Sequence, residues 1–172
     1  MKGGILARGI ASQMLACMYS LMDCITRCPE KEWNERHNDY PYSQVVFHVL
    51  FDGDLSLSSG KEELLSQAFH LDNKEAFADY EELADKARAN LYDREFIKRY
   101  YEHCLNKIKS VVEAQRDEDL LIPDSDFYKS MTKAERYINA IRHMQHHVAQ
   151  LGLRLQFLSG QEMTWVSRGY DA

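Results

Sequence analysis

The sequence lacks the cysteine patterns of secreted proteins and of zinc ribbons. It contains only four cysteines, and they show neither the Cys-x-x-Cys spacing of a zinc ribbon nor the density of a disulfide scaffold. Three of them continue an apolar stripe on the first predicted helix, which favours small core side chains over reactive thiols. We therefore expect reduced thiols at Cys17, Cys24, Cys28 and Cys104.

Positive charge is also scarce. The formal net charge is −6 at pH 7, and no basic cluster offsets it. Nucleic-acid affinity comes largely from Lys and Arg side chains that neutralise phosphates, so we expect no nucleic-acid partner. The N-terminal segment carries Arg8, Gln13, Asp23 and Arg27, which indicates neither a signal peptide nor an apolar run of membrane length. A cytoplasmic protein without a membrane partner is expected.

Several signatures of fold and function are missing as well. The sequence shows no convincing strand alternation, no repeat of solenoid period, and no phosphate loop, dinucleotide fingerprint or nucleophile elbow. Its composition, 45% hydrophobic and 28% charged, is typical of a soluble globular protein. A length of 172 residues suits a single domain, 1–172, that can bury a core without disulfides or a structural metal.

Apolar residues at helical spacing predict two long helices in the first part of the chain. The first covers 5–28 and stops at Pro29. A polar and aromatic loop over 30–42 then leads to a second helix over 43–58.

Two more long helices are expected in the second part. Asp93 can cap a third helix that continues to about Gln115, and a fourth begins near Thr132 and ends near Gly160. Four amphipathic helices without strands predict an all-α fold, and a four-helix bundle is the simplest architecture for them.

The connector between the second and third helices, over 60–92, is expected to be partly helical. Asp72 and Glu75 resemble a capping box, and the residues that follow have helical spacing. These residues are Phe77, Tyr80, Ala84 and Ala87.

Two histidines on the fourth helix have the spacing of metal ligands. A helix advances about 100° per residue, so His143 and His147 lie within about 40° of each other, at the border of the apolar stripe. His146 points roughly opposite the centre of that stripe, and we interpret it as solvent-facing. The alternative interpretation is a chance pair four residues apart.

His48 on the second helix is expected to point into the bundle, because it occupies the middle of an apolar face. Neutral imidazole is a common ligand of borderline metals, and three nitrogen ligands leave a position open for water or substrate. We therefore predict that His48, His143 and His147 bind one divalent transition-metal ion. The alternative is a core histidine that only hydrogen-bonds to a neighbour. Asp52, one turn later, can orient His48, act as a further ligand, or be a surface carboxylate.

The other histidines, His37, His70 and His103, are assigned no role. They are expected in a loop, in the connector and on a charged helical surface, without a partner at ligand spacing.

Four segments resemble the DinB-like, or damage-inducible, superfamily of metal-dependent enzymes over nearly the full chain. They are Val46-Phe47-His48-Val49-Leu50-Phe51, Asp93-Arg94-Glu95-Phe96, the specific run from His143 through His146-His147 to Leu151, and Trp165-Val166-Ser167-Arg168-Gly169. Ser167, where glycine is commoner in the family, is a departure from the pattern.

The resemblance implies a DinB-like bundle in which His48, His143 and His147 hold the metal and the C-terminal segment packs beside the site. It also implies nickel or zinc, with manganese or iron as alternatives, a homodimer, and a small-molecule substrate such as a low-molecular-weight thiol. Arg168 would contact an anionic group, and Tyr42 or Tyr137 would line the cleft.

Three functions follow from these expectations. The first is a metal-dependent transferase or hydrolase that activates water or a thiol. The second is a non-catalytic metal or small-molecule binding protein of a stress response, because no Glu or Asp stands beside the histidine pair as a built-in base. The third is a structural bundle that dimerises through an apolar helix face.

Overall fold

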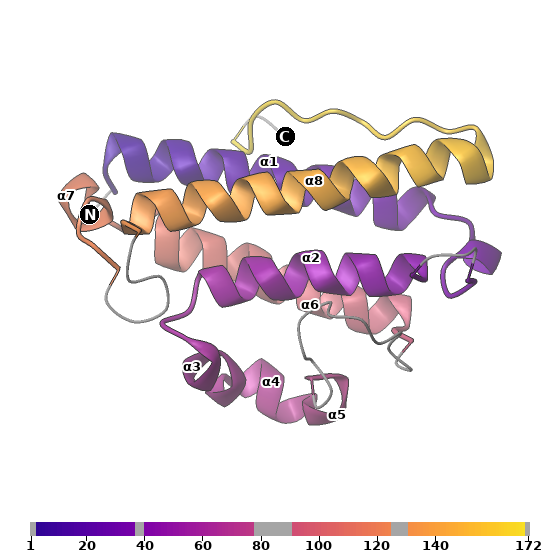
Figure 1. Ribbon diagram of the computed structural model, residues 1–172, viewed down its shortest axis with the longest axis horizontal. Coiled ribbons are helices and arrows are strands. Elements are labelled where there is room, and N and C mark those ends of the chain that lie inside the picture. The colour runs from indigo at the N-terminus through magenta and orange to yellow at the C-terminus, as the bar shows by residue number, and fades with distance from the viewer. Residues whose placement is uncertain (1–2, 37–39, 78–90, 125–130, 171–172) are drawn as a thin grey trace.

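The described part of the chain is entirely helical in its regular elements. The computed structural model describes residues 3–36, 40–77, 91–124 and 131–170, and these contain no strand beyond one isolated bridge between Pro123 and Thr132. The expected all-α class is confirmed (Figure 1). The elements are α1 Ile5–Arg27, η1 Glu30–Glu32, α2 Tyr42–Ser56, α3 Lys61–Ser66, α4 Ala68–Asp72, α5 Lys74–Phe77, α6 Arg94–Lys107, η2 Ile108–Val112, α7 Asp117–Leu120 and α8 Lys133–Ser159.

The ends of the long helices follow from local sequence. Asp93 caps α6 by accepting a hydrogen bond from the backbone of Phe96 at 2.8 Å. Thr132 and Glu135 form a reciprocal capping box at the start of α8, and Gly160 ends it in the left-handed conformation. The predicted third helix is interrupted, since α6 stops at Lys107 and the chain continues as a wider π-helical turn, η2.

The long helices pack as two parallel pairs that run antiparallel to each other. Within the pairs, Cys17 of α1 lies beside Gln145 of α8, and Leu50 of α2 lies beside Cys104 of α6. Between the pairs, Tyr42 at the start of α2 lies beside Leu151 in the second half of α8. In Figure 1, α1 and α8 form one layer, and α2 and α6 form the other.

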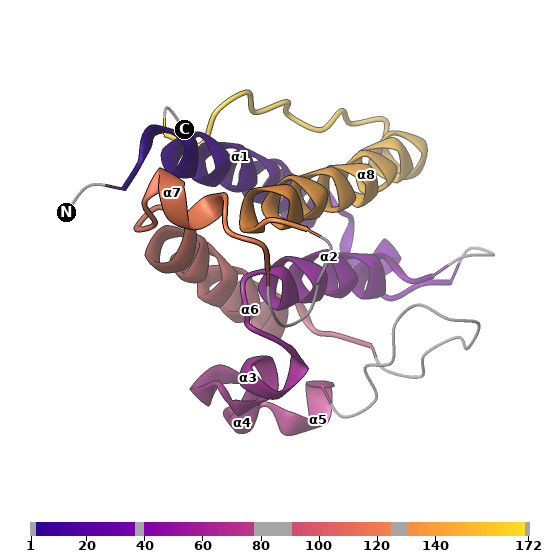
Figure 2. The ribbon, with the colours of Figure 1, turned by 60° about the vertical axis from the view of Figure 1, so that its left-hand side comes forward.

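Because α2 and α6 run parallel, the chain must return along the length of α2 before α6 begins. The connector makes this return, and its α3, α4 and α5 lie beside α2 and α6 on the side away from α1 and α8 (Figures 1 and 2). The helix predicted after Asp72 is present as α5 up to Phe77; its remainder falls in 78–90, outside the described residues.

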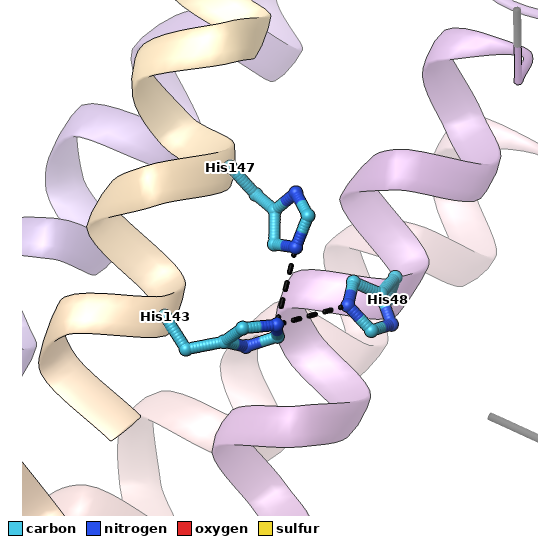
Figure 3. Close-up of side chains that lie close together, drawn as sticks. All are labelled: His48, His143 and His147. Atoms are coloured by element: carbon cyan, nitrogen blue, oxygen red, sulfur yellow. Dashed lines mark hydrogen bonds between the residues drawn. The ribbon is translucent and has the colours of Figure 1, made fainter. Parts of the chain in front are cut away.

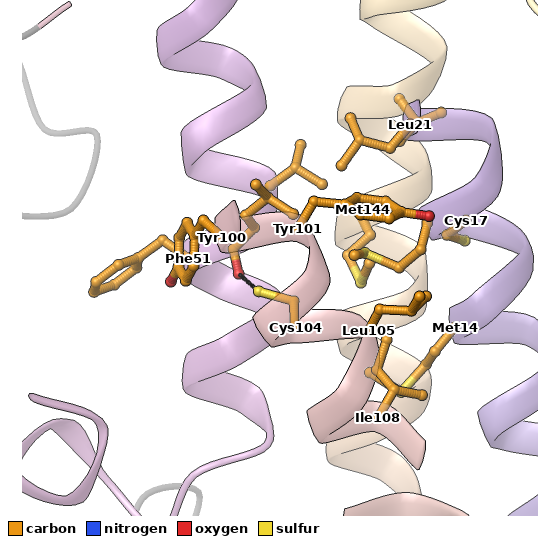
Figure 4. Packing of buried hydrophobic residues seen from close by; sticks show 14 of the residues in the cluster. Met14, Cys17, Leu21, Phe51, Tyr100, Tyr101, Cys104, Leu105, Ile108 and Met144 are labelled. Atoms are coloured by element: carbon orange, nitrogen blue, oxygen red, sulfur yellow. Dashed lines mark hydrogen bonds between the residues drawn. The ribbon is translucent and has the colours of Figure 1, made fainter. Parts of the chain in front are cut away.

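The core lies between the two layers and is built from all four long helices. Figure 4 shows Met14 and Leu21 of α1 facing Met144 of α8 and Leu105 of α6. Helix α1 is long and apolar enough to span a membrane by length and composition, but 61% of its most apolar window is buried inside the fold. Its apolar character is therefore accounted for by packing.

Candidate metal centre

A close approach of α2 and α8 brings the predicted ligands together. Gly53 of α2 lies against Met144 of α8, where an added Cβ would sit 3.4 Å from the methionine sulfur. The absence of a side chain at Gly53 therefore lets the two helices pack closely. His48 lies five residues before Gly53, and His143 is the neighbour of Met144, so this contact brings their imidazoles together across the helix pair, edge to face, with the ring planes 81° apart.

The three histidines converge through their Nε2 atoms (Figure 3). His143 Nε2 lies 3.2 Å from His48 Nε2 and 3.1 Å from His147 Nε2. Metal–nitrogen bonds of ~2.1 Å place neighbouring ligands about 3.0 Å apart at a right angle and about 3.4 Å apart at a tetrahedral angle. The observed spacing falls in this range, so the three residues can hold one ion without a large rearrangement.

Two of the histidines have an acceptor beside the ring nitrogen that faces away from the centre. Asp52 Oδ2 lies 2.8 Å from His143 Nδ1, and Gln150 Oε1 lies 2.8 Å from His147 Nδ1. An acceptor at Nδ1 keeps the proton there and leaves the Nε2 lone pair free for an ion. The sequence left Asp52 as a residue that orients His48, a further ligand or a surface carboxylate; in the structure it lies beside His143 on the facing helix, because its side chain points across the α2–α8 contact.

These neighbours shift the proton affinities in opposite directions. The contact with the Asp52 carboxylate raises the pKa of His143 above the ordinary value, and burial only partly offsets this. For His147, burial lowers the pKa, and the contact with Gln150 opposes it. Protons at these two rings are therefore held unequally when no ion is bound.

The site opens on one side into a cleft of about 380 Å³. His48 is 7% exposed, while His143 and His147 are half-buried, so the ligands are held by packing yet remain accessible from this side. The lining residues are Tyr40, Gln44, Val45, His48, His147, Gln150, Leu153 and Arg154. Arg154 brings a charged side chain to the described part of this lining, and it is held by donating to the Tyr40 carbonyl at 2.8 Å.

The structure also places the two histidines that were excluded from the site and the two tyrosines that were expected to line the cleft. His146 is exposed, as expected for a solvent-facing bystander, whereas His37 lies outside the described residues. Tyr42 and Tyr137, which were expected to line the cleft, are both buried: the Tyr42 hydroxyl donates to the Leu151 carbonyl, and the Tyr137 hydroxyl accepts from Gln115.

The C-terminal segment also differs from the expectation that it packs beside the site. Gly169 donates to Ser12 of α1 at 3.1 Å, and the Ser167 carbonyl accepts from Gln13 of α1 at 3.2 Å. Arg168 is exposed and is not among the residues that line the cleft. The segment therefore fastens the chain end to α1.

The motif that opens α6 has a structural role. The Arg94 guanidinium donates to the carbonyls of Ile25 and Cys28 at the end of α1 and lies 4.3 Å from the centre of the Trp33 ring. These contacts join the end of α1 to the start of α6.

The expectation that His70 and His103 lack a partner at ligand spacing was wrong. Both approach the carboxylate of Asp54, which is fully buried on α2. His103 was expected on a charged surface, but its helix turns this position toward α2. No sequence spacing links the three residues, because they come from three separate elements.

Comparisons with known proteins add no relative. No protein-family profile, no curated protein and no solved structure matches the chain.

Proposed function

We propose that the protein is a divalent-metal-dependent transferase or hydrolase of DinB-like type, with His48, His143 and His147 as the metal ligands. The observation that carries the proposal is the convergence of three Nε2 atoms, 3.1 and 3.2 Å apart, at the wall of an open cleft. Three protein ligands with an open side are typical of catalytic metal sites, whereas structural sites are closed by four. The resemblance to the DinB-like superfamily, including its four-helix bundle, supports the same proposal.

A bound divalent ion would lower the pKa of a water or thiol in the cleft and so supply a nucleophile near neutral pH. The chain's own residues would orient both the ligands and the substrate. Asp52 and Gln150 hold the two α8 histidines with Nε2 toward the centre. Gln44 and Gln150 offer amide groups along the wall, and Arg154 places a guanidinium there that suits an anionic substrate group.

The donor set favours a borderline ion, with nickel or zinc ahead of manganese and iron, because imidazole suits all of them and carboxylate ligands are absent from the triad. A low-molecular-weight thiol fits this proposal as substrate. We also propose a cytoplasmic homodimer, for which the exposed Leu153 and Phe157 of α8 offer an apolar contact surface.

A second candidate function is metal or small-molecule binding without turnover. Among the described residues that line the cleft, none is a carboxylate that could act as a general base. Asp52 is already engaged with His143 and is not among them. In the enzymatic case, a bound substrate group or a solvent water would have to accept the proton that the nucleophile loses.

The proposal is tested by metal content. Tag-free protein purified without chelators is measured by elemental mass spectrometry beside a His143→Ala/His147→Ala variant. We expect the wild type to hold one more divalent ion per chain than the variant, with the helical content of the variant retained. His146→Ala is the matched control, since it removes an exposed histidine from the same helix and should keep the wild-type metal content. Equal metal content in the wild type and the double variant, or no metal in the wild type after reconstitution, would remove the basis for an enzyme and leave a helical binding or interaction protein.

A further inference from the structure

The second cluster of potential ligands lies on the opposite flank of α2. Asp54 contributes from α2, His70 from α4 and His103 from α6. Asp54 follows His48 by six residues, which corresponds to about 120° around the helix axis. One helix thus presents a histidine to α8 and a carboxylate to α6 and the connector.

The donor atoms have the spacing of ligands in one coordination sphere. Asp54 Oδ2 lies 3.1 Å from His70 Nε2 and 3.5 Å from His103 Nε2. Metal bonds of ~2.1 Å predict edges of about 3.0 to 3.4 Å for such atoms. Two imidazoles and one carboxylate are a common donor set for divalent first-row transition metals.

The histidine nitrogens are buried without hydrogen bonds among the described residues. His70 is 1% exposed, and neither of its ring nitrogens has a hydrogen-bond partner there; the same holds for His103 Nε2. Both Nε2 atoms are close to Oδ2, but not in the alignment that a hydrogen bond requires. Buried polar atoms are rarely left in this condition, because the lost hydration costs free energy. An ion held by Asp54 Oδ2 and the two Nε2 atoms would satisfy both of these nitrogens.

Aromatic packing holds the two rings in place. The His70 ring lies 4.2 Å from the Phe77 ring, and the His103 ring is stacked 4.9 Å from Phe69. His103 retains 21% side-chain exposure, which provides a route for an ion from solvent. We propose that Asp54, His70 and His103 form a second divalent-metal site, distinct from the three-histidine centre, that fastens the connector to α2 and α6.

Lys107 is the main opposing feature. Its ammonium lies 2.6 Å from Asp54 Oδ1 and 2.5 Å from Ser58 Oγ, so the carboxylate already has a cationic partner. The lysine uses Oδ1, whereas the histidines face Oδ2, so an ion and the lysine do not need the same oxygen. Repulsion between the two cations nevertheless weakens the site. Binding should therefore be weaker here than at the three-histidine centre.

The site is tested by Co²⁺ titration, because ligand-field absorption reports the donor atoms directly. In the full-length His143→Ala/His147→Ala variant, where the first centre is disabled, we expect saturable binding of one Co²⁺. Adding His103→Gln should abolish it, while adding His146→Ala should leave it unchanged. Far-UV circular dichroism establishes that each variant is folded. In the wild type, His103→Gln should reduce the Co²⁺ stoichiometry from two to one.

The Lys107→Met variant distinguishes two interpretations of the cluster: a metal site and an ion pair that is purely structural. Removing the ammonium should tighten Co²⁺ binding by about tenfold or more, because one positive charge near the dication is lost. Absence of saturable binding in the background variant and in its Lys107→Met derivative would overturn the proposal, as would binding that survives His103→Gln. Either failure leaves the three-histidine centre untouched, because that centre is tested separately by its own double variant.

Discussion

Asp52 Oδ2 and His143 Nδ1 lie 2.8 Å apart, and this contact joins α2 to α8 beside the converging Nε2 atoms. The two residues are 91 positions apart in the chain. Asp52 thus determines both the proton affinity of His143 and the ring nitrogen that is available to an ion.

Asp52→Asn should lower the pKa of His143 in the metal-free protein. The carboxylate raises that pKa in the wild type, and an amide carries no charge to do so. The raised pKa means that the pair stabilises the fold fully below the unfolded value of about 6.5, and that this stabilisation is lost as pH rises through the folded pKa. An NMR titration of the His143 ring measures the shift. An unchanged His143 titration curve in Asp52→Asn would contradict the assignment of this shift to the Asp52 carboxylate.

Asp54→Asn should destabilise the metal-free protein by about 3–5 kcal/mol near neutral pH, since it leaves the buried Lys107 ammonium without a carboxylate. Burial disfavours the charged form of Asp54, but His103, His70 and Lys107 outweigh it and hold the pKa below its usual range. A lowered pKa contributes stability that is present above the unfolded value of about 3.9 and is lost as pH falls.

The difference in unfolding free energy between the wild type and Asp54→Asn is measured by denaturant unfolding in the presence of a chelator, at a series of pH values from 7 down into the acid range. The difference in unfolding free energy between wild type and Asp54→Asn should narrow below about pH 4, because Asp54 then takes up a proton in the unfolded wild-type chain while it stays ionised in the fold. A difference in unfolding free energy that stays constant across this pH range would show that the charge of Asp54 does not stabilise the fold.

The thiols should be inert in the folded protein. All four cysteines are free and buried, and burial raises the pKa of Cys17, Cys24 and Cys28 to about 11. Thiolate, the reactive form, is therefore scarce near neutral pH. A thiol-specific chromogenic reagent at pH 7.5 should label none of them natively and all four in denaturant. Rapid native labelling would indicate a reactive cysteine instead.

Gly169→Ala should loosen the C-terminal segment. An added Cβ would lie 2.3 Å from Leu15 Cβ of α1, so the segment must move away, at a cost of about 1–3 kcal/mol in unfolding free energy. Gly9→Ala is the matched control: no atom lies within 4 Å of its added Cβ, and the change should stabilise α1 by about 0.5–1 kcal/mol. Thermal and denaturant unfolding distinguish the expected loss of stability in Gly169→Ala from the expected gain in Gly9→Ala. Equal effects would mean that the close contact at Gly169 does not constrain the segment.

Local periodicity was sufficient to predict the long helices and part of the metal centre. His143 and His147 share a face because helical geometry alone places residues four apart together, and the apolar stripe indicated the direction of that face. The inward position of His48 followed from the same argument applied to α2. Each of these inferences used residues within one element.

The relations between elements could not be predicted in this way. Asp52 lies on the expected helix, yet its partner is His143, because partner choice depends on how α2 and α8 pack. The parallel course of α2 and α6 likewise depends on where the connector crosses.

The sequence by itself therefore determined the four long helices, the start of α6, both ends of α8 and the three histidines as a candidate ligand set. Only the tertiary structure decided that Asp54, His70 and His103 meet. Their convergence depends on the docking of α4 against α2 and α6, and that docking is set by the shapes of buried side chains far apart in the chain. Helical periodicity carries no information about contacts of that range.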